Sequence, residues 1–192
     1  VLGTAGALVG MGPKPGDRIL MRLGNTVEFP ILFLAALAVD MVPVPTSSQL
    51  TAPEVAGLLP GLGPALVVQG AGVAVPEETP CPVLPAAALA GMHDHAPADY
   101  VMGAPDRLGY IIYTSGTSGV ARAVMHAHRA IWARRMMWTG WYGLGEADRL
   151  LHAGAFNWTY TLGTGLMDPW SIGATALIPG PGADRHTLPL LI

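Results

Sequence analysis

The stretch Tyr113–Gly119, YTSGTSG, decides how the rest of this 192-residue chain is interpreted. It follows the largely apolar run Leu108–Ile112, so we predict a loop that leaves a buried strand. Glycines let a backbone approach an anion closely and turn several N–H groups toward it, and Thr and Ser add hydroxyl donors with little bulk. The stretch therefore suits a phosphate group, although clusters of Ser, Thr and Gly also form ordinary surface turns.

The composition is that of a globular chain with a sizeable core. Hydrophobic residues make up 51% of the chain and charged residues only 12%, which excludes an intrinsically disordered segment. One domain, or one and a half, is expected at this length. The formal net charge of -3 gives no electrostatic basis for binding nucleic acid or an anionic membrane surface, so an anionic ligand must be held by a local site.

Export and membrane insertion are not indicated by the sequence. The longest apolar run, Phe29–Val39, is well short of the roughly 20 residues that span a bilayer, and no basic segment precedes it as in a signal peptide. Cys81 is the single cysteine, which excludes an internal disulfide and fits a reducing cytosol. We therefore predict a cytoplasmic protein. Because the chain begins at Val1 and stops in the apolar stretch Leu188–Ile192, we expect it to be a piece of a longer protein.

Lysine usage excludes the commonest class of phosphate-binding loop. Lys14 is the only lysine, and the other nine basic residues are arginines. A Walker-type loop needs a lysine directly before its Ser or Thr, because the ammonium group contacts the phosphates. The stretch Tyr113–Gly119 has no such lysine, so a P-loop nucleotide hydrolase is not predicted.

Alternating strand and helix patterns in the first half predict a parallel sheet covered by helices. Asn25 with Glu28 has the form of a capping box before a nearly all-apolar helix that runs to Val39, and Thr51 with Glu54 repeats this signal. In such α/β folds ligands gather at the carboxyl ends of the strands. The predicted strands are Arg18–Leu23, Met41–Pro45, Ala65–Gln69 and a short one near Val83.

Beyond the glycine-rich stretch the pattern predicts further strands and one long helix. Ala123–Met125 and Arg149–Ala153 are predicted strands, and Arg129–Tyr142 is a predicted helix with apolar residues on one face. Arg134 and Arg135 flank that face, and we interpret them as arginines whose stems lie along the core while their charged ends reach water.

Residues 70–105 carry a weak pattern and are predicted to be mostly irregular surface. They contain His93-Asp94-His95 and Asp99, which are metal-ligating residue types. One His-x-His pair without a third ordered ligand is a weak zinc signal, so a solvated loop is the preferred interpretation.

The complete segment Tyr113–His128, YTSGTSGVARAVMHAH, resembles the signature of the AMP-forming acyl-CoA synthetase family. That superfamily also contains luciferases and peptide-synthetase adenylation domains. The likeness runs in order from about Gly16 to Gly180 and therefore covers nearly the whole chain. The other segments that carry it are Pro15–Arg18, Asn25–Ala38, Val42–Pro45, Leu50–Glu54, Ala147–Leu151 and Gly173–Thr175.

The resemblance implies a two-step ligase that uses ATP, Mg²⁺ and coenzyme A. A carboxylate attacks the α-phosphorus of ATP to form acyl-AMP and pyrophosphate, and a thiol then takes the acyl group. Arg122 stands where the family generally carries a lysine, and its rigid guanidinium fork is not equivalent to an ammonium. The residues implied to bind the β- and γ-phosphates are Thr114, Ser115, Gly116, Thr117, Ser118 and Gly119, together with Arg122.

The resemblance also implies where the carboxylic acid binds. An aromatic segment after the last predicted strand would border the acyl pocket, with Trp158 limiting its depth; aromatic side chains of this kind also simply pack in cores. The likeness is greatest to synthetases for short, medium or aromatic carboxylic acids, and fatty acid metabolism is the expected process. The implied pocket residues are Phe156, Asn157, Trp158, Thr159 and Tyr160.

Residues 1–192 are expected to be a partial N-terminal AMP-binding domain. The C-terminal part of the large domain, and the small C-terminal domain that carries the family's catalytic lysine, have no counterpart here, and Lys14 cannot replace that lysine. We therefore expect the catalytic lysine outside this piece, little or no ligase activity from the piece alone, and no metal-ligating residue within it. A homo-oligomer is left open.

Two other functions remain open from the sequence. The scaffold can serve as a catalytically inactive module that binds a nucleotide or a partner, which the presence of Arg122 and the early end of the chain allow. It can also belong to an adenylation domain that loads a carrier-protein thiol in place of coenzyme A. The choice of thiol is not encoded in this part of the chain.

Overall fold

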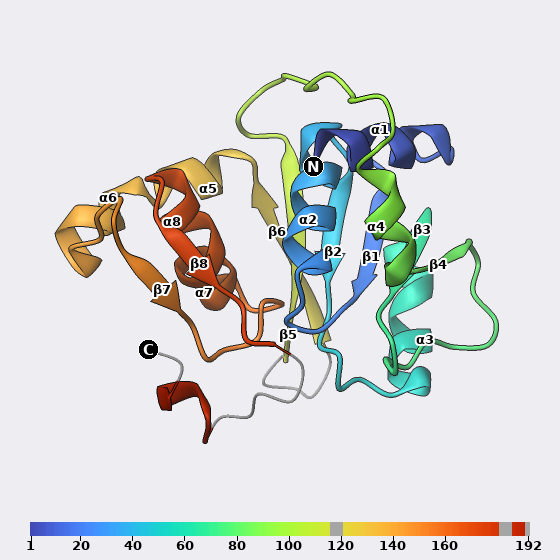
Figure 1. The fold of residues 1–192 in the computed structure, drawn as a ribbon. Coiled ribbons are helices and arrows are strands. Elements are labelled where there is room, and N and C mark those ends of the chain that lie inside the picture. The colour runs from blue at the N-terminus through green and yellow to red at the C-terminus, as the bar shows by residue number, and fades with distance from the viewer. Residues whose placement is uncertain (116–120, 181–185, 191–192) are drawn as a thin grey trace.

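A four-stranded parallel sheet forms the centre of the fold (Figure 1). The computed structural model describes residues 1–115, 121–180 and 186–190. The strands lie in the order β2-β1-β3-β4, and each pair of neighbours is parallel. This arrangement confirms the predicted α/β fold class with a parallel sheet. The strands are β1 (Arg18–Arg22), β2 (Val42–Pro45), β3 (Leu66–Gln69) and β4 (Val83–Pro85).

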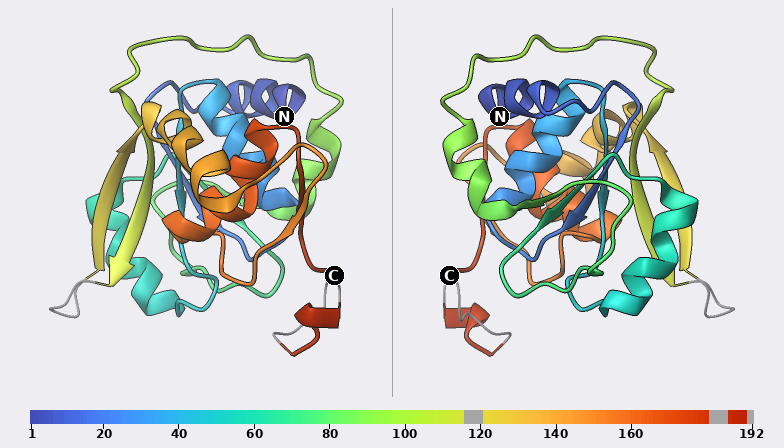
Figure 2. Two further views of the ribbon diagram at one scale, coloured as in Figure 1. Left: turned by 90° about the vertical axis from the view of Figure 1, so that its left-hand side faces the viewer. Right: turned by 90° about the vertical axis from the view of Figure 1, so that its right-hand side faces the viewer.

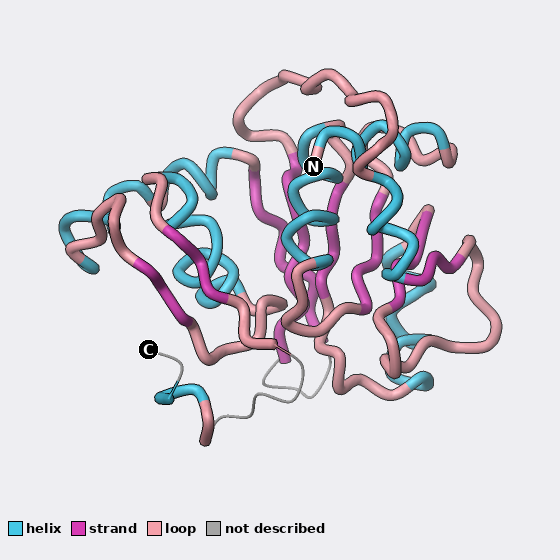
Figure 3. Tube along the Cα trace, viewed as in Figure 1, coloured by secondary structure: helices cyan, strands magenta, loops and turns pink. Residues whose placement is uncertain are grey.

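Helices cover both faces of this sheet, as the two side views show (Figure 2). One face carries three helices, and the other carries the fourth. Strand and helix alternate along the first half of the chain (Figure 3), which is the pattern that a parallel sheet requires. The helices on the first face are α1 (Leu2–Gly10), α2 (Glu28–Ala38) and α4 (Leu89–Met92), which the 3₁₀ turn η1 (Ala86–Ala88) precedes; α3 (Ala52–Leu62) lies on the second face.

The period of two along each strand divides the apolar side chains between two cores. Ile19 and Met21 of β1 lie in the core that contains Phe33 of α2, whereas Leu20 lies in the core that contains Leu59 of α3. These strand residues are fully buried. Helix α2 is apolar on nearly all sides, as predicted, because it is enclosed on nearly all sides.

An antiparallel hairpin extends this layer beside β2. It consists of β5 (Leu108–Ser115) and β6 (Ala121–Ala127), and β5 lies next to β2. Tyr110 and Ile112 belong to the first core, and Ile111 belongs to the second. The predicted strands in these segments are confirmed, and the structure lengthens both toward the glycine-rich stretch that joins them.

The two predicted capping boxes have different outcomes. At α3 the prediction is confirmed, because the Glu54 carboxylate accepts from the backbone N–H and the hydroxyl of Thr51 at 2.8 Å each. At α2 the prediction is wrong, since the helix begins at Glu28 and its N-cap is Val27, with no side-chain cap. Asn25 lies before the helix, and its side chain bonds elsewhere, as described below.

The second half of the chain is built from short elements. The predicted helix over residues 129–142 is helical except at Arg134, but it is not one regular α-helix, because its last five residues form a π-helix. A turn at Arg134, whose guanidinium binds Asp168 on another helix, divides the segment, and Gly140 weakens helical propensity in its last turn. The elements are α5 (Arg129–Ala133), α6 (Arg135–Met137), the π-helix η2 (Trp138–Tyr142), β7 (Arg149–Leu151), α7 (Thr159–Leu162), the π-helix η3 (Gly163–Met167), α8 (Asp168–Ser171), β8 (Thr175–Leu177) and the 3₁₀ turn η4 (Leu188–Leu190).

Strands β7 and β8 pair in parallel and form a separate small sheet. The helical segments between them turn their apolar side toward the first core, which includes Phe156, Leu162 and Leu166. The carboxyl ends of β1 and β7 both lead into loops that meet near the lower end of the central sheet in Figure 1. The candidate site lies beside this meeting point, where the loop after β7 continues to Asn157 and Trp158.

Candidate functional site

A pocket of about 380 Å³ opens where the loop after β2, helix α3, the hairpin and the loop after β7 come together. Its volume lies within the range of small-molecule sites in proteins. Two groups of residues predicted from separate motifs meet here, namely Thr114 of the predicted phosphate loop and Asn157 with Trp158 of the predicted acyl pocket. The complete lining is Ser47, Leu50, Glu54, Gly57, Leu58, Tyr113, Thr114, Ala121, Asn157 and Trp158.

The hairpin sets the relative position of the predicted phosphate-binding residues that can be described. Thr114 on β5 lies directly opposite Arg122 on β6 in the antiparallel ladder, and Ser115 lies opposite Ala121. Opposed residues of an antiparallel pair project from the same face, so the hydroxyl of Thr114 and the guanidinium of Arg122 are neighbours. Gly116, Thr117, Ser118 and Gly119 lie outside the described residues.

Arg122 differs from three other arginines of the chain in having no ionic partner among the described residues. Arg107, Arg129 and Arg134 each pair with an aspartate, whereas Arg122 forms no ion pair within residues 1–115, 121–180 and 186–190. Its side chain is exposed at the end of the hairpin. Arg122 therefore brings a positive charge to the hairpin side of the site, which suits an anionic ligand there, while Glu54 places a carboxylate on the α3 side.

The five predicted acyl-pocket residues lie in different surroundings. Asn157 is 8% exposed and Trp158 is 44% exposed, and both line the pocket. Phe156 is buried in the core, where its ring centroid is 5.4 Å from that of Phe29. Thr159 begins α7, and Tyr160 is largely exposed with its ring edge against His152. The structure thus brings two of the five residues to the pocket that also contains Thr114.

The wall formed by α3 was missed in the sequence analysis. Leu50, Gly57 and Leu58 carry no chemical signature, and Glu54 was assigned only a capping role. Hydrogen bonds from Thr51 lower the pKa of the Glu54 carboxyl, because they stabilise its charged form. The rule that ligands gather beyond the carboxyl ends of parallel strands pointed to this segment, since it follows β2.

Arg22 fixes the loop that forms the pocket's floor. It ends β1, is fully buried, and donates to the carbonyls of Ala74 at 3.1 Å and Leu50 at 2.9 Å. It also donates to the Thr46 hydroxyl at 3.1 Å and to the carbonyl of Ser47. Burial lowers the pKa of the Arg22 guanidinium, and the charge of Glu54 opposes this shift. One side chain therefore holds the loops after β2 and β3 together.

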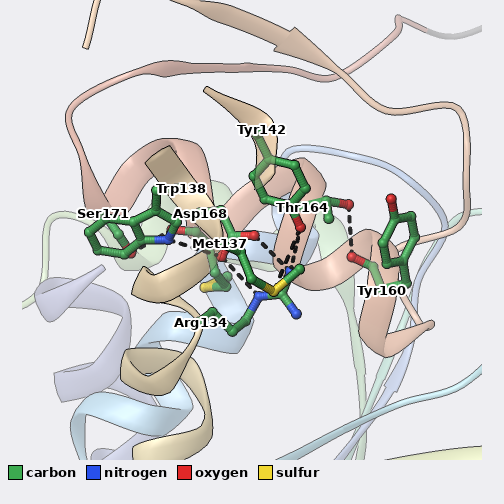
Figure 4. Close-up of polar contacts among 9 residues, drawn as sticks. Arg134, Met137, Trp138, Tyr142, Tyr160, Thr164, Asp168 and Ser171 are labelled. Atoms are coloured by element: carbon green, nitrogen blue, oxygen red, sulfur yellow. Dashed lines mark hydrogen bonds and ion pairs between the residues drawn. The ribbon is translucent and has the colours of Figure 1, made fainter. Parts of the chain in front are cut away.

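Arg134 and Asp168 form a second polar centre, with Tyr142 and Trp138 around it (Figure 4). The guanidinium donates twice to the carboxylate, at 2.9 and 2.7 Å, and Asp168 is only 1% exposed. Tyr142 and Trp138 lie against the pair. Burial alone lowers the pKa of Arg134, but the hydrogen bonds and charge of Asp168 outweigh it and raise that pKa overall. The expectation that Arg134 extends to water is therefore wrong.

His152 stabilises the start of the loop between β7 and α7. Its Nδ1 accepts from the backbone N–H of Gly154 at 3.0 Å, so that nitrogen is unprotonated in the folded state. Burial lowers the pKa of the His152 imidazole, which favours this neutral form.

Neither a metal centre nor a membrane span is found in the described residues. They contain no group of three or more His, Cys, Asp or Glu side chains that could hold a metal ion. His93 and Asp94 pair with each other at 3.1 Å on the surface, which agrees with a solvated loop. None of the described helices is long and apolar enough to cross a membrane.

Several acid–CoA ligases resemble this chain in sequence. It is 33% identical to the long-chain-fatty-acid–CoA ligase FadD13 of Mycobacterium tuberculosis over 160 residues, which are 77% of this chain and 32% of that protein. It is 29% identical to the 4-hydroxybenzoate–CoA/benzoate–CoA ligase of Rhodopseudomonas palustris over 188 residues, which are 89% of this chain and 35% of that ligase. The chain thus spans about a third of the length of these relatives.

Solved structures agree with the sequence relationships. The N-terminal domain of FACL13 from Mycobacterium tuberculosis superposes with a TM-score of 0.84 at 28% identity, over 100% of this chain and 50% of that structure. The family described as AMP-binding enzyme matches residues 1–191. The chain therefore belongs to the AMP-binding enzyme family, and it corresponds to the N-terminal portion of acyl- and aryl-CoA ligases.

Proposed function

We propose that this chain is the N-terminal part of the large domain of an ATP-dependent, AMP-forming carboxylate–CoA ligase. The observation that carries the proposal is the pocket in which Thr114, Asn157 and Trp158 meet beside Arg122, which has no ion pair among the described residues. One pocket then receives the phosphate chain of ATP from the hairpin side and the carboxylic acid from the side of the loop after β7. The catalytic lysine and the remainder of the site lie on segments outside these 192 residues.

In the proposed reaction the hairpin side of the pocket binds the phosphates, and the side of the loop after β7 binds the carboxylic acid. A carboxylate oxygen attacks the α-phosphorus, the bond to the bridging oxygen breaks, and pyrophosphate leaves with the bonding electrons. The hydroxyl of Thr114, the neighbouring residues 115–119 and the guanidinium of Arg122 stabilise the charge that collects on that leaving group. In a second step the coenzyme A thiol attacks the acyl carbon and AMP leaves.

Mg²⁺ fits this scheme as a companion of ATP. Magnesium keeps several waters and takes few protein ligands beside substrate phosphates, and no cluster of metal-ligating side chains exists in the described residues. The acid is proposed to be short, medium or aromatic, since Trp158 stands at the wall of a pocket of about 380 Å³. Any test must include both fatty acids and aromatic acids, because the relatives are named for long-chain fatty acids and for benzoates.

The test uses the full-length protein that contains this chain. Purified protein is assayed for acid-dependent pyrophosphate exchange and for thioester formation with benzoate, hexanoate and palmitate. Removing one preorganised donor for developing charge costs about 100-fold to 1,000-fold in rate, so Arg122→Ala and Thr117→Ala should each lower adenylation to about that extent. Arg122→Lys should retain much of the activity, because it keeps the charge.

Arg149→Ala is the matched control, since Arg149 is also an exposed strand arginine but lies on β7, away from the pocket. It should leave the rate of adenylation unchanged. If Arg122→Ala and Thr117→Ala leave acyl-adenylate formation untouched, the assignment of the site is wrong. Strong pyrophosphate exchange by the isolated 192-residue chain would contradict the proposal that essential groups lie outside it. A carrier protein that accepts the acyl group faster than coenzyme A would identify an adenylation domain instead.

A further inference from the structure

Asn25 makes an unusual connection between distant parts of the chain. It lies in the turn between β1 and α2, and its side chain reaches the loop after β7. Its Nδ2 donates to the carbonyl oxygen of Gly154 at 2.8 Å, and its Oδ1 accepts from the backbone N–H of Phe156 at 2.9 Å. The two partners fix the orientation of the amide, because a carbonyl needs a donor and an N–H needs an acceptor.

These two hydrogen bonds are the only ones that join residues 1–115 to residues 149–180 in the parts of the chain that the structure describes. The two regions also share an apolar core, as between Phe29 and Phe156, whose ring centroids are 5.4 Å apart. Apolar contact is non-directional and holds a loop down without setting its register. The Asn25 amide therefore sets how the loop after β7 is placed against the central sheet.

The position of Asn25 affects the pocket through the next residues of that loop. The bonded groups belong to residues 154 and 156, and the pocket lining begins at once with Asn157 and Trp158. Gly154 is itself closely confined, because a side chain there would collide with Thr161 and contact the His152 ring. A displacement of the loop at 154–156 is therefore passed directly to the side chains of Asn157 and Trp158.

We propose that Asn25 is a positioning residue that sets the binding of the carboxylic acid by fixing the Asn157–Trp158 wall of the pocket. This inference rests on the proposed function above, because it concerns the acid side of the same pocket. The inference separates the two substrates, because Thr114 and Arg122 belong to the hairpin, whereas the two side-chain hydrogen bonds of Asn25 described above go to the loop after β7. Changes at Asn25 should alter the KM for the acid and leave the KM for ATP nearly unchanged.

Asparagine suits this role better than similar residues. A planar amide offers one donor and one acceptor to a backbone C=O and N–H, much as a neighbouring strand does. Asp keeps the acceptor for Phe156 but sets a second oxygen against the carbonyl of Gly154. Ala removes both bonds. The KM for the acid should therefore rise from the wild type through Asn25→Asp to Asn25→Ala. The two variants should have equal KM values if the unfavourable pair of oxygens in Asn25→Asp outweighs the bond that Asp retains.

The kinetic test compares these variants in the full-length protein, with Gln69→Ala as matched control. Gln69 is also a side-chain amide at the carboxyl edge of the sheet, but it donates only to the nearby carbonyl of Val73 at 2.7 Å. Asn25→Ala should raise the KM for the acid about tenfold, with less than a twofold change in the KM for ATP and in kcat. Gln69→Ala should change neither KM. A rise in both KM values together, or in neither, overturns the inference.

Backbone hydrogen exchange gives a second readout that does not depend on ligase activity. The Phe156 N–H is bonded to Asn25, so Asn25→Ala should speed exchange in the segment 153–160 about tenfold, and Gln69→Ala should leave it unchanged. If the wild-type protein activates no acid, the proposed function fails, and exchange in this segment alone decides the role of Asn25. Unchanged exchange in Asn25→Ala overturns that role even in an active ligase.

Discussion

Residues 1–92 and residues 129–180 differ in how their helices are stabilised. In α2 most side chains are buried, including Phe29 and Phe33. In α5, α6 and η2 no residue is buried, and Trp132 and Trp141 are 62% and 70% exposed. The helices of the first region thus rest on close apolar packing. In the second region η3 and its neighbours reach the same core, whereas α5, α6 and η2 are held by a few specific contacts such as Arg134–Asp168.

Because of this difference, we expect the two regions to respond to different kinds of mutation. Where stability comes from close packing, loss of volume is costly and polar changes at the surface are not. Where an element is held by an ion pair or an amide, removal of one charge or one donor has the larger effect. The candidate pocket lies between the two regions, so its shape depends on both.

The largest effect is expected in the first region, from Phe33→Ala. The Phe33 side chain is fully buried, with its ring centroid 6.2 Å from Phe29 and 5.5 Å from Tyr110. Truncation of a buried phenylalanine costs about 3–5 kcal/mol, a large share of the roughly 5–15 kcal/mol that stabilises a typical domain. Urea unfolding followed by circular dichroism measures this change in the free energy of unfolding.

Trp141→Ala in the second region provides the contrast. The removed side chain is larger, but it is 70% exposed, so the free energy of unfolding should change by less than about 0.5 kcal/mol. Equal losses from Phe33→Ala and Trp141→Ala would remove the distinction between the two regions.

An intermediate effect is expected from Asp168→Asn, which tests the polar anchor of the second region. The substitution keeps the shape of the side chain but removes the charge that faces the half-buried guanidinium of Arg134. Hydrogen bonds to charged groups contribute about 1.5–3 kcal/mol, and a loss of about 2 kcal/mol in the free energy of unfolding is expected. Chemical denaturation at pH 7 measures it.

The exposed pair Arg129–Asp106 supplies the control for this prediction. Both side chains are 65% exposed, and surface ion pairs contribute about 0–1 kcal/mol. Asp106→Asn should therefore have a much smaller effect than Asp168→Asn. If the two substitutions cost the same, burial does not determine the strength of the Arg134–Asp168 pair.

The same contrast explains which parts of the fold the sequence could predict. The strands and helices of the first region carry local signals: a short apolar run in β1, an apolar helix in α2, and the Thr51–Glu54 capping box at α3. Each signal is complete within a few residues. The contact of Arg134 with Asp168 joins residues that are 34 positions apart, so the pattern of residues 129–142 alone could not predict it.

Asn25 shows the same limit for the candidate site. Its spacing from Glu28 fits a capping box, but a partner 129 residues away competes for the same amide, and that partner prevails. Thr114, Asn157 and Trp158 were predicted because they belong to motifs with a recognisable pattern. Leu50 and Leu58 were not, because an apolar wall is defined only by its position in the folded chain.

The smallest effect concerns acid stability, and it tests the loop that joins the two regions. Burial lowers the pKa of His152, so the folded state binds fewer protons than the unfolded state when the pH falls below the ordinary imidazole value of about 6.5. Unfolding then takes up protons, and stability decreases as the pH falls. Burial lowers the pKa of His126 and His128 as well, and both contribute with the same sign.

His152→Asn isolates the contribution of this loop. The asparagine has an acceptor oxygen for the Gly154 N–H, which Nδ1 of His152 binds at 3.0 Å, but it does not titrate. Between pH 7.5 and 5.5 the variant should lose up to about 1 kcal/mol less stability than the wild type, as measured by urea unfolding at several pH values. His128→Asn, at the far end of the hairpin, should also reduce the change of the free energy of unfolding with pH. The reductions from His152→Asn and His128→Asn should add, because the two sites share no partner. If the free energy of unfolding of His152→Asn changes with pH as steeply as that of the wild type, the neutral imidazole does not stabilise the loop.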